Sequence, residues 1–501
     1  MYMKKSASII MFTIIFLSTP VLAAEFQPTW ESLSLHESAP EWFKDAKFGI
    51  YFHWGVYSVP AFGSEWYPRD MHIKKKPEYK HHVETYGEPT QFGYHDFVPQ
   101  FKAEKFDADQ WADLFAKAGA RFAGPVAEHH DGFSMWASKI NPWNAKDKGP
   151  HRDIAGEIAQ AVRKRGMKFV TSFHHARNNL YEKEGRSGKN WTGHYEYVKK
   201  DFPSLLDNKE NAILYGYLPR EEFLQRWKGK LIEVIDNYQP DLMWFDSWLD
   251  EIPDQVKMEY LAYYFNHAKK LNKEVVVTFK QNDLPSSVGV LDLEKGRMDK
   301  KTDFYWLTDD TISLGSWCYT QDLRIKSTKR VLHSLIDIVS KNGVLLLNIS
   351  PMADGTIPEE QRKVLTEMGQ WLAVNGQAIY NTRTWYTMGE GPTGKDLPKG
   401  QFGGVADPKG GYSSEDIRYT QSKDGKTIYA IALGRPEAAG EIVLTSFAAD
   451  KLPTTISIAD VTVLETGEKI ATSRDERGLI LTAPRSKVND LAVVFKINIQ
   501  K

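Results

Sequence analysis

The chain of 501 residues is long enough for two or three domains with large cores. Its 64 lysines and arginines nearly balance its 65 aspartates and glutamates, which excludes a strongly basic protein built to bind nucleic acid or an anionic membrane. The single cysteine, Cys318, excludes an internal disulfide, so the packing of the core must hold the fold together.

The first 24 residues have the pattern of a secretory signal. Lys4 and Lys5 precede the apolar run 9–17, and residues 21–24 have the small side chains typical of a cleavage site. The run is too short to cross a membrane as a helix, and the rival interpretation is a buried N-terminal helix. We expect residues 1–24 to be removed and the mature protein to have no membrane anchor. Export without disulfides is typical of a bacterial periplasmic or secreted protein.

Apolar, strand-like runs alternate with helical patterns through most of residues 25–385. The strand-like runs are 48–54, 121–128, 168–174, 242–246, 274–280, 290–294, 303–307 and 344–349. The helical patterns are 108–118, 153–165, 221–237, 255–271, 327–341 and 358–374. This alternation predicts a parallel sheet, and eight strands predict a (β/α)8-type barrel, regular or distorted, as the catalytic domain over residues 25–385. No helical pattern separates the runs between residues 290 and 307.

From residue 386 the pattern changes to short runs rich in β-formers. Glycine and proline cluster at 389–411, and the runs 417–421, 427–433, 441–445, 455–464, 479–482 and 490–496 follow. Turn signals such as Lys423-Asp-Gly425 separate them. We expect residues 386–501 to form an all-β domain, most simply a sandwich.

Polar and aromatic side chains follow the ends of the predicted barrel strands, where barrel enzymes place their active sites. They are His53, Glu65 and Trp66 after the first run; Glu128, His129 and His130 at the second; His174 at the third; Trp244 and Asp246 in the fourth; Lys280 at the fifth; and Glu294 at the sixth. Histidine donors, tryptophan faces and several carboxylates are suited to binding a polyol and cleaving an acetal. The simpler interpretation of Asp246 is that it caps the next helix.

Three pairs of adjacent histidines, at 81–82, 129–130 and 174–175, invite a comparison with zinc sites. Neighbouring residues on a strand point to opposite faces, so each pair offers a given site one ligand at most, and the other member is expected in the core. We therefore expect no metal. Cys318 has no attached base, and no Gly-x-Ser-x-Gly elbow, phosphate loop or dinucleotide motif calls for another chemistry or a cofactor.

Five motifs occur in order along the predicted barrel. They are Phe48-Gly-Ile-Tyr-Phe-His-Trp-Gly55, Glu65-Trp-Tyr67, His129-His-Asp-Gly-Phe133, Trp244-Phe-Asp246 and Asn342-Gly-Val-Leu-Leu-Leu-Asn-Ile-Ser-Pro351 with Asp354-Gly355. Together they resemble the retaining α-L-fucosidases of glycoside hydrolase family 29, and His-His-Asp-Gly-Phe is the most specific. The resemblance implies a distorted (β/α)8 barrel followed by a β-sandwich. It also implies that Asp246 is the nucleophile and that His53, Glu65, Trp66, His129, His130 and Trp244 line the fucose pocket.

Two departures from that family pattern affect the acid/base and a pocket cation. Many members carry Trp-Glu ahead of a Ser-Trp-Gly-Tyr-like segment, whereas this chain has Trp306-Leu307 and Ser316-Trp-Cys-Tyr319. A pocket arginine common after the fifth strand is missing, and Lys280 is the nearest cation that can replace it. We assign the acid/base to Glu294, with Glu65, Glu128 and Asp292 as alternatives.

The sequence thus predicts a retaining exo-α-L-fucosidase that acts on fucosylated oligosaccharides, polysaccharides or glycoconjugates by double displacement. A barrel glycosidase for another sugar, such as an α-galactoside, is the nearest alternative. A catalytically silent carbohydrate-binding protein would lack the paired acids, and a metal-dependent hydrolase would lose activity in chelator.

Overall fold

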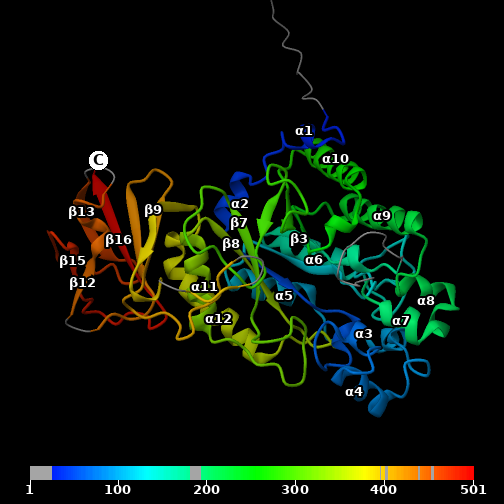
Figure 1. Cartoon of the computed structure of the whole chain (residues 1–501). Helices are drawn as coiled ribbons and strands as arrows, with labels where there is room; N and C mark the ends of the chain where they lie inside the picture. Colours follow the sequence, from blue (N-terminus) through cyan, green and yellow to red (C-terminus); the bar gives the residue numbers. More distant parts are fainter. Residues whose placement is uncertain are drawn as a thin grey trace, which may run out of the picture.

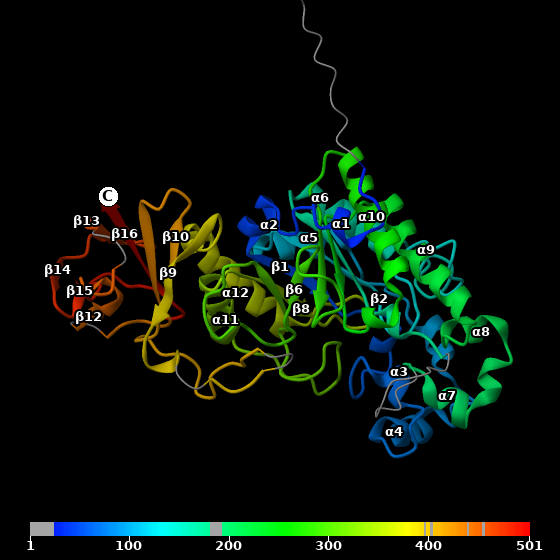
Figure 2. The same cartoon turned by 45° about the horizontal axis from the view of Figure 1, so that its top comes forward.

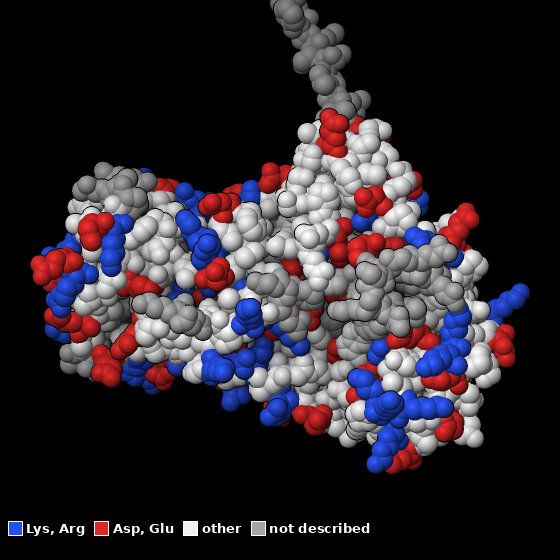
Figure 3. All heavy atoms as spheres, in the orientation of Figure 1, with Lys and Arg blue, Asp and Glu red and all other residues white. Residues whose placement is uncertain are grey.

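The computed structural model describes residues 25–180, 193–394, 397–400, 404–437, 440–452 and 456–500. The predicted signal at residues 1–24 lies outside these ranges. Within them, no helix combines the length and the apolar character that crossing a membrane requires. Figure 3 shows basic and acidic side chains interspersed on the visible face, as the balanced charge of the chain suggests.

Eight parallel strands close into a barrel in sequence order, so the predicted (β/α)8-type fold is confirmed (Figure 1). The strands are β1 (Phe48–Phe52), β2 (Phe122–Glu128), β3 (Lys168–Phe173), β4 (Leu242–Phe245), β5 (Val276–Lys280), β6 (Val290–Asp292), β7 (Trp306–Thr311) and β8 (Gly343–Ile349). Pairing of β1 with β8 completes the closure.

The strands are apolar because both of their faces are buried. In β4, Leu242 and Trp244 belong to the cluster of side chains inside the barrel, whereas Met243 and Phe245 pack against the surrounding helices. Such strands cannot show the polar alternation of a half-exposed sheet. Phe43, which precedes β1, belongs to the interior cluster.

Long helices cover most of the barrel wall. They are α5 (Ala108–Lys117), α6 (Ile154–Lys164), α9 (Arg220–Tyr238), α10 (Asp254–Lys270), α11 (Thr328–Ser340) and α12 (Glu359–Asn375). Shorter helices are α1 (Trp30–Leu33), α2 (Glu41–Ala46), α3 (Tyr67–Asp70), α4 (Pro77–Tyr86), α7 (Glu196–Asp201) and α8 (Lys209–Leu214). Residues 281–289 and 293–305, all described, contain no helix, so the barrel is distorted around β6.

One predicted strand was misplaced. The run 303–307 was expected, but β7 spans Trp306–Thr311 and includes Asp309 and Asp310. Both aspartates are compensated within the fold, because Tyr51 donates a hydrogen bond to Asp309 and Lys326 forms an ion pair with Asp310. An apolar run therefore does not reveal that the strand continues through two aspartates to Thr311.

The C-terminal part forms two antiparallel sheets. The first has the order β13 (Ser457–Val463), β16 (Val493–Gln500), β11 (Thr427–Ala432), β10 (Ile417–Ser422) and β9 (Thr382–Glu390); the second has β12 (Glu441–Leu444), β15 (Gly478–Thr482) and β14 (Thr472–Asp475). Leu444 and Leu481 of the second sheet share a core with Ile428 and Phe495 of the first, as in a sandwich. The predicted domain boundary at residue 385 falls within β9.

Figures 1 and 2 place these sheets beside α11 and α12, on the opposite side of the barrel from α7 and α8. Helix α11 contacts both β9 and β10. The C-terminal domain therefore packs against the side of the barrel covered by α11, the helix that contacts β8.

Candidate active site

Asp246 lies directly after β4, at the carboxyl end of the barrel. Its backbone N–H donates a hydrogen bond to the Phe173 carbonyl at 3.1 Å, so parallel pairing with β3 continues for one residue and fixes the start of the loop. The carboxylate is 16% exposed, and His130 Nε2 and His174 Nδ1 lie 3.3 and 3.4 Å from its Oδ2 atom. The carboxylate therefore contacts side chains that follow β2 and β3, which does not match the role of a helix cap.

Lys280, at the end of β5, joins two carboxylates. Its Nζ atom lies 3.1 Å from Asp246 Oδ1 and 2.8 Å from Glu294 Oε2, and it also lies 4.7 Å from the centre of the Trp244 ring. The structure therefore brings both predicted catalytic carboxylates and Lys280 together. The sequence predicts that Lys280 binds substrate, and in the structure it contacts both acids.

The two carboxylates differ in their electrostatic surroundings. Burial opposes ionisation of Asp246, but the Lys280 ammonium and the two adjacent histidine rings hold the pKa of Asp246 well below its ordinary value. Burial raises the pKa of Glu294, and the neighbouring negative charges of Asp309 and Asp246 add to this effect against the opposing charge of Lys280. The arrangement therefore favours an ionised Asp246 and a protonated Glu294.

Two further buried acids lie beneath Lys280. Asp292 and Asp309 have oxygens 3.8 and 3.7 Å from its Nζ atom. Asp292 accepts the Asp309 backbone N–H at 3.0 Å, and Tyr51 donates to Asp309 at 2.9 Å. Burial and the charge of Asp309 raise the pKa of Asp292 well above its ordinary value. Asp292 is fully buried, so it is poorly placed to act as the acid/base.

Four histidines cluster beside Asp246, at the ends of β1, β2 and β3. His53, His129 and His174 bring ligand atoms within 4.8 Å of one another, and the rings of His129 and His130 are 4.6 Å apart. Asn348 Oδ1 accepts hydrogen bonds at 2.8 Å from both the backbone and Nδ1 of His53, which leaves Nε2 as an acceptor. Burial lowers the pKa of His53 and of His129 well below the ordinary value, so these rings are neutral.

Each candidate group of ligand atoms takes only one member of the His129–His130 pair, as expected, but the expectation that the other member lies in the core was wrong for this pair. Both follow the end of β2, where the alternation of a strand no longer applies, and both reach the pocket. It holds for the third strand, because His175 turns to the core and stacks on Trp227. Three clustered histidines have donor atoms that suit a metal as well as sugar hydroxyls; the absence of a metal requirement stays a prediction, which activity in chelator tests.

Glu65 and Trp66 directly precede α3. Glu65 Oε2 accepts the Trp317 backbone N–H at 3.0 Å and the Ser316 hydroxyl at 3.2 Å, and its side chain is buried. The ring of Trp66 lies 5.3 Å from that of His130. The Ser316-Trp-Cys-Tyr319 segment, which supplies no acid of its own, therefore fixes one in place.

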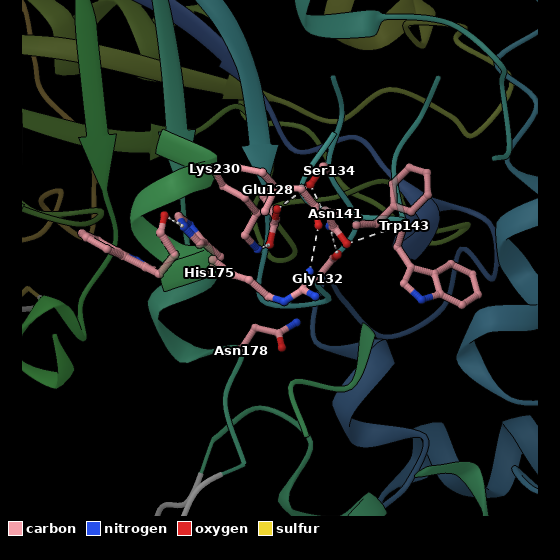
Figure 4. Close-up of polar contacts among 12 residues, drawn as sticks. Glu128, Gly132, Ser134, Asn141, Trp143, His175, Asn178 and Lys230 are labelled. Carbon is pink, nitrogen blue, oxygen red and sulfur yellow. Dashed lines mark hydrogen bonds and ion pairs between the residues drawn. The ribbon is translucent and has the colours of Figure 1, made fainter. Parts of the chain in front are cut away.

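Glu128 points away from the pocket. Figure 4 shows it between Lys230 of α9 and Ser134, with which it forms an ion pair and a hydrogen bond of 2.6 Å. The carboxylate is fully buried, and both of its oxygens have partners. Glu128 is thus committed to joining β2 to α9 and is not available to a substrate.

Three contributors to the site were not assigned a role from the sequence. Asn348 orients His53, Asp309 supports Lys280, and the Arg177 guanidinium lies 4.4 and 4.5 Å from the ring centres of Trp66 and Trp248. The sequence contains a signal for Asn348, because it is a polar residue inside the apolar run 344–349. Arg177 had no such signal, because its position depends on the loop that follows β3.

Comparisons with known proteins agree with this geometry. The family model described as Alpha-L-fucosidase matches residues 14–377, and the Alpha-L-fucosidase C-terminal domain matches residues 412–498. Human tissue alpha-L-fucosidase is 31% identical over 471 residues, which cover 92% of this chain and 88% of that protein. Rat tissue alpha-L-fucosidase is 35% identical over 376 residues, which cover 73% of this chain and 74% of that protein. The crystal structure of Thermotoga maritima alpha-fucosidase in complex with fucose has a TM-score of 0.72 and 29% identity and covers 94% of this chain and 100% of that one.

Proposed function

Because the chain belongs to the α-L-fucosidase family of glycoside hydrolases, we propose that it removes terminal α-L-fucose from fucosylated glycans with retention of configuration. Asp246 is the nucleophile and Glu294 the acid/base of a double displacement. The α-fucosidase from Thermotoga maritima was crystallised with fucose, which supports fucose as the sugar bound in this pocket.

The observation that carries this proposal is the shared contact with Lys280. Since Nζ lies 3.1 Å from Asp246 Oδ1 and 2.8 Å from Glu294 Oε2, those two oxygens are separated by at most the sum of these distances. That limit lies below the roughly 6.5–9.5 Å that inverting glycosidases need for a water molecule between their carboxyl groups. It is compatible with the roughly 5–5.5 Å of retaining enzymes.

The electrostatics assign the two roles. Ionised Asp246 attacks the anomeric carbon while protonated Glu294 donates its proton to the leaving oxygen. Asp246 then becomes a neutral ester, and the Lys280 ammonium is left beside the newly charged Glu294 carboxylate. Glu294 next takes a proton from the water that hydrolyses the ester, which restores the starting charges.

The surrounding side chains fit a neutral sugar. The neutral histidines and buried Glu65 offer hydrogen bonds to hydroxyl groups, and the partly exposed Trp66 ring offers apolar surface for the 6-methyl group of fucose, whereas Trp244 is fully buried beneath the site. Because Glu65 is tied to Trp317 and Ser316, we assign it to substrate binding and not to proton transfer.

Replacing the nucleophile tests the reaction type. Asp246→Ala should lower kcat by at least about 10³-fold with the fold intact, because no neighbouring group can form the covalent intermediate. Azide should restore turnover of an aryl fucoside and yield the fucosyl azide of inverted configuration. Nuclear magnetic resonance identifies the product, and near-normal activity of the folded variant would refute the assignment.

Replacing the acid/base should separate substrates by their leaving group. Glu294→Ala should slow cleavage of natural fucosides by about 10²-fold or more, and cleavage of an aryl fucoside with a good leaving group far less, because only a poor leaving group needs a proton. Glu65→Ala is the comparison, since loss of a binding residue should impair both substrates alike. Initial rates on the two substrates are measured. If Glu294→Ala lowered both rates by the same factor, another residue would be the general acid.

The charge of Lys280 sets the position of the pH profile. Productive enzyme needs ionised Asp246 on the acid limb and protonated Glu294 on the alkaline limb, and Lys280 lowers the pKa of both groups. Lys280→Met should therefore move both apparent limbs of kcat/KM to higher pH, whereas Lys280→Arg should move them less. Unchanged limbs in Lys280→Met would show that the ammonium does not control these groups.

We also propose that the protein is exported after removal of residues 1–24, on the basis of the basic, apolar and small-residue pattern there. Mass spectrometry of protein recovered from the periplasm or medium of a bacterial host should find an N-terminus at Ala24 or Glu25. Recovery of the exported chain with Met1 intact would contradict cleavage.

A further inference from the structure

The loop that carries Glu294 has no helix to support it. Glu294 lies just beyond β6, Lys295 adopts a left-handed backbone with φ of 47°, and its N–H donates to the Asp309 carbonyl at 2.8 Å. Thr308 donates to the Gly296 carbonyl at 2.6 Å. These bonds attach one side of the loop to β7. A strained residue next to a catalytic acid persists only where the surroundings fix the backbone.

The other side of the loop is attached to the C-terminal part of the chain. The N–H of Arg297 donates to the Val405 carbonyl at 3.0 Å, and the N–H of Val405 donates back to the Arg297 carbonyl at 2.8 Å. Val405 belongs to the connection between β9 and β10. Two reciprocal backbone bonds therefore join the loop after β6 to the C-terminal domain, only three positions after Glu294 in the sequence.

The Arg297 side chain adds a buried charge cluster to this contact. Its guanidinium lies 3.4 Å from Asp337 of α11 and forms an ion pair with Asp407 of the β9–β10 connection. Asp337 also accepts hydrogen bonds from Arg418 of β10 at 2.6 Å and from Lys341 at 2.7 Å. We call Asp337, Arg297, Arg418 and Lys341 the Asp337 cluster; all four side chains are buried.

Burial makes this cluster a rigid connection. Burial alone would raise the pKa of Asp337, but three surrounding cations hold it far below its ordinary value, so the aspartate is charged. Removing one partner of a buried ion pair leaves an uncompensated charge, so the cluster resists opening. Arg297 and Arg418 reach the same aspartate, but only Arg297 lies on the loop of the acid/base.

We propose that the C-terminal domain positions the catalytic acid/base, with Arg297 as the positioning residue that transmits this constraint to Glu294. The inference rests on the proposed role of Glu294. A general acid must lie within hydrogen-bond reach of the leaving oxygen, and a displacement of about 1 Å can cost up to about 10²-fold in rate. The β9–β10 connection thereby takes over the support that a helix after β6 would give.

Arg297→Met and Arg418→Met form a matched pair of variants. Each removes one buried cation from Asp337, so both should lower the free energy of unfolding, but only the first releases the loop of Glu294. Arg297→Met should lower kcat/KM for a natural fucoside about 10-fold and that for an aryl fucoside with a good leaving group about twofold or less. Arg418→Met should change the ratio of these two rates by no more than about twofold.

Two further variants make the test independent of the stability of Arg297→Met. Arg297→Lys keeps the charge and should recover most of the rate on the natural fucoside. Asp407→Asn weakens the attachment from the C-terminal side and should change the ratio of rates in the same direction as Arg297→Met. Circular dichroism at the assay temperature confirms that each measured variant is folded.

Glu294→Ala, measured in parallel, separates the two proposals. If it shows the leaving-group effect but Arg297→Met and Asp407→Asn do not, the positioning role is wrong and the acid assignment stands. If Arg418→Met matches Arg297→Met on both substrates, the cluster acts only through stability and the inference also fails. If Glu294→Ala lacks the leaving-group effect, both proposals fall.

Discussion

The active site depends on the single ammonium group of Lys280, which lies among four carboxylates. Asp246 and Glu294 contact it from the pocket, and Asp292 and Asp309 lie beneath it. One positive charge cannot balance four negative ones in a buried site, so some of the acids must hold protons. The surroundings decide which: Lys280 and then the histidines favour an ionised Asp246, whereas burial and then the neighbouring acids favour a protonated Glu294. Strands β4 to β7 therefore all contribute to one charge balance.

Much of the fold could be predicted from the sequence because each barrel strand is buried on both faces and reads as an apolar run. The prediction failed at β7, where Asp309 and Asp310 interrupt the run but are compensated by Tyr51 and Lys326. Those partners are distant in sequence, and a local pattern contains no sign of them. The missing helices around β6 could be anticipated, because the spacing between 290 and 307 leaves no room for a helical pattern.

The residues of the candidate site were harder to rank than to find. Glu128 and Glu294 both end apolar runs of the sequence, and the sequence does not reveal that Glu128 forms an ion pair with Lys230 of α9. The histidines show a similar limit. Alternation along a strand applies only as far as the strand continues, and β2 stops at Glu128, so His129 and His130 both reach the pocket. In both cases the direction of a side chain depends on where its strand ends and on a partner far along the chain.

The contact between Arg297 and Val405 also bears on how the protein folds during synthesis. These residues are separated along the chain by β7, β8, β9 and two long helices, so their contact closes a long loop. Because closing a long loop costs conformational entropy, we expect this contact to form late in folding. A ribosome releases the chain from the N-terminal end, and the strands of the barrel emerge well before the β9–β10 connection. The wall around Glu294 is therefore completed by residues that become available only when most of the chain has already been made.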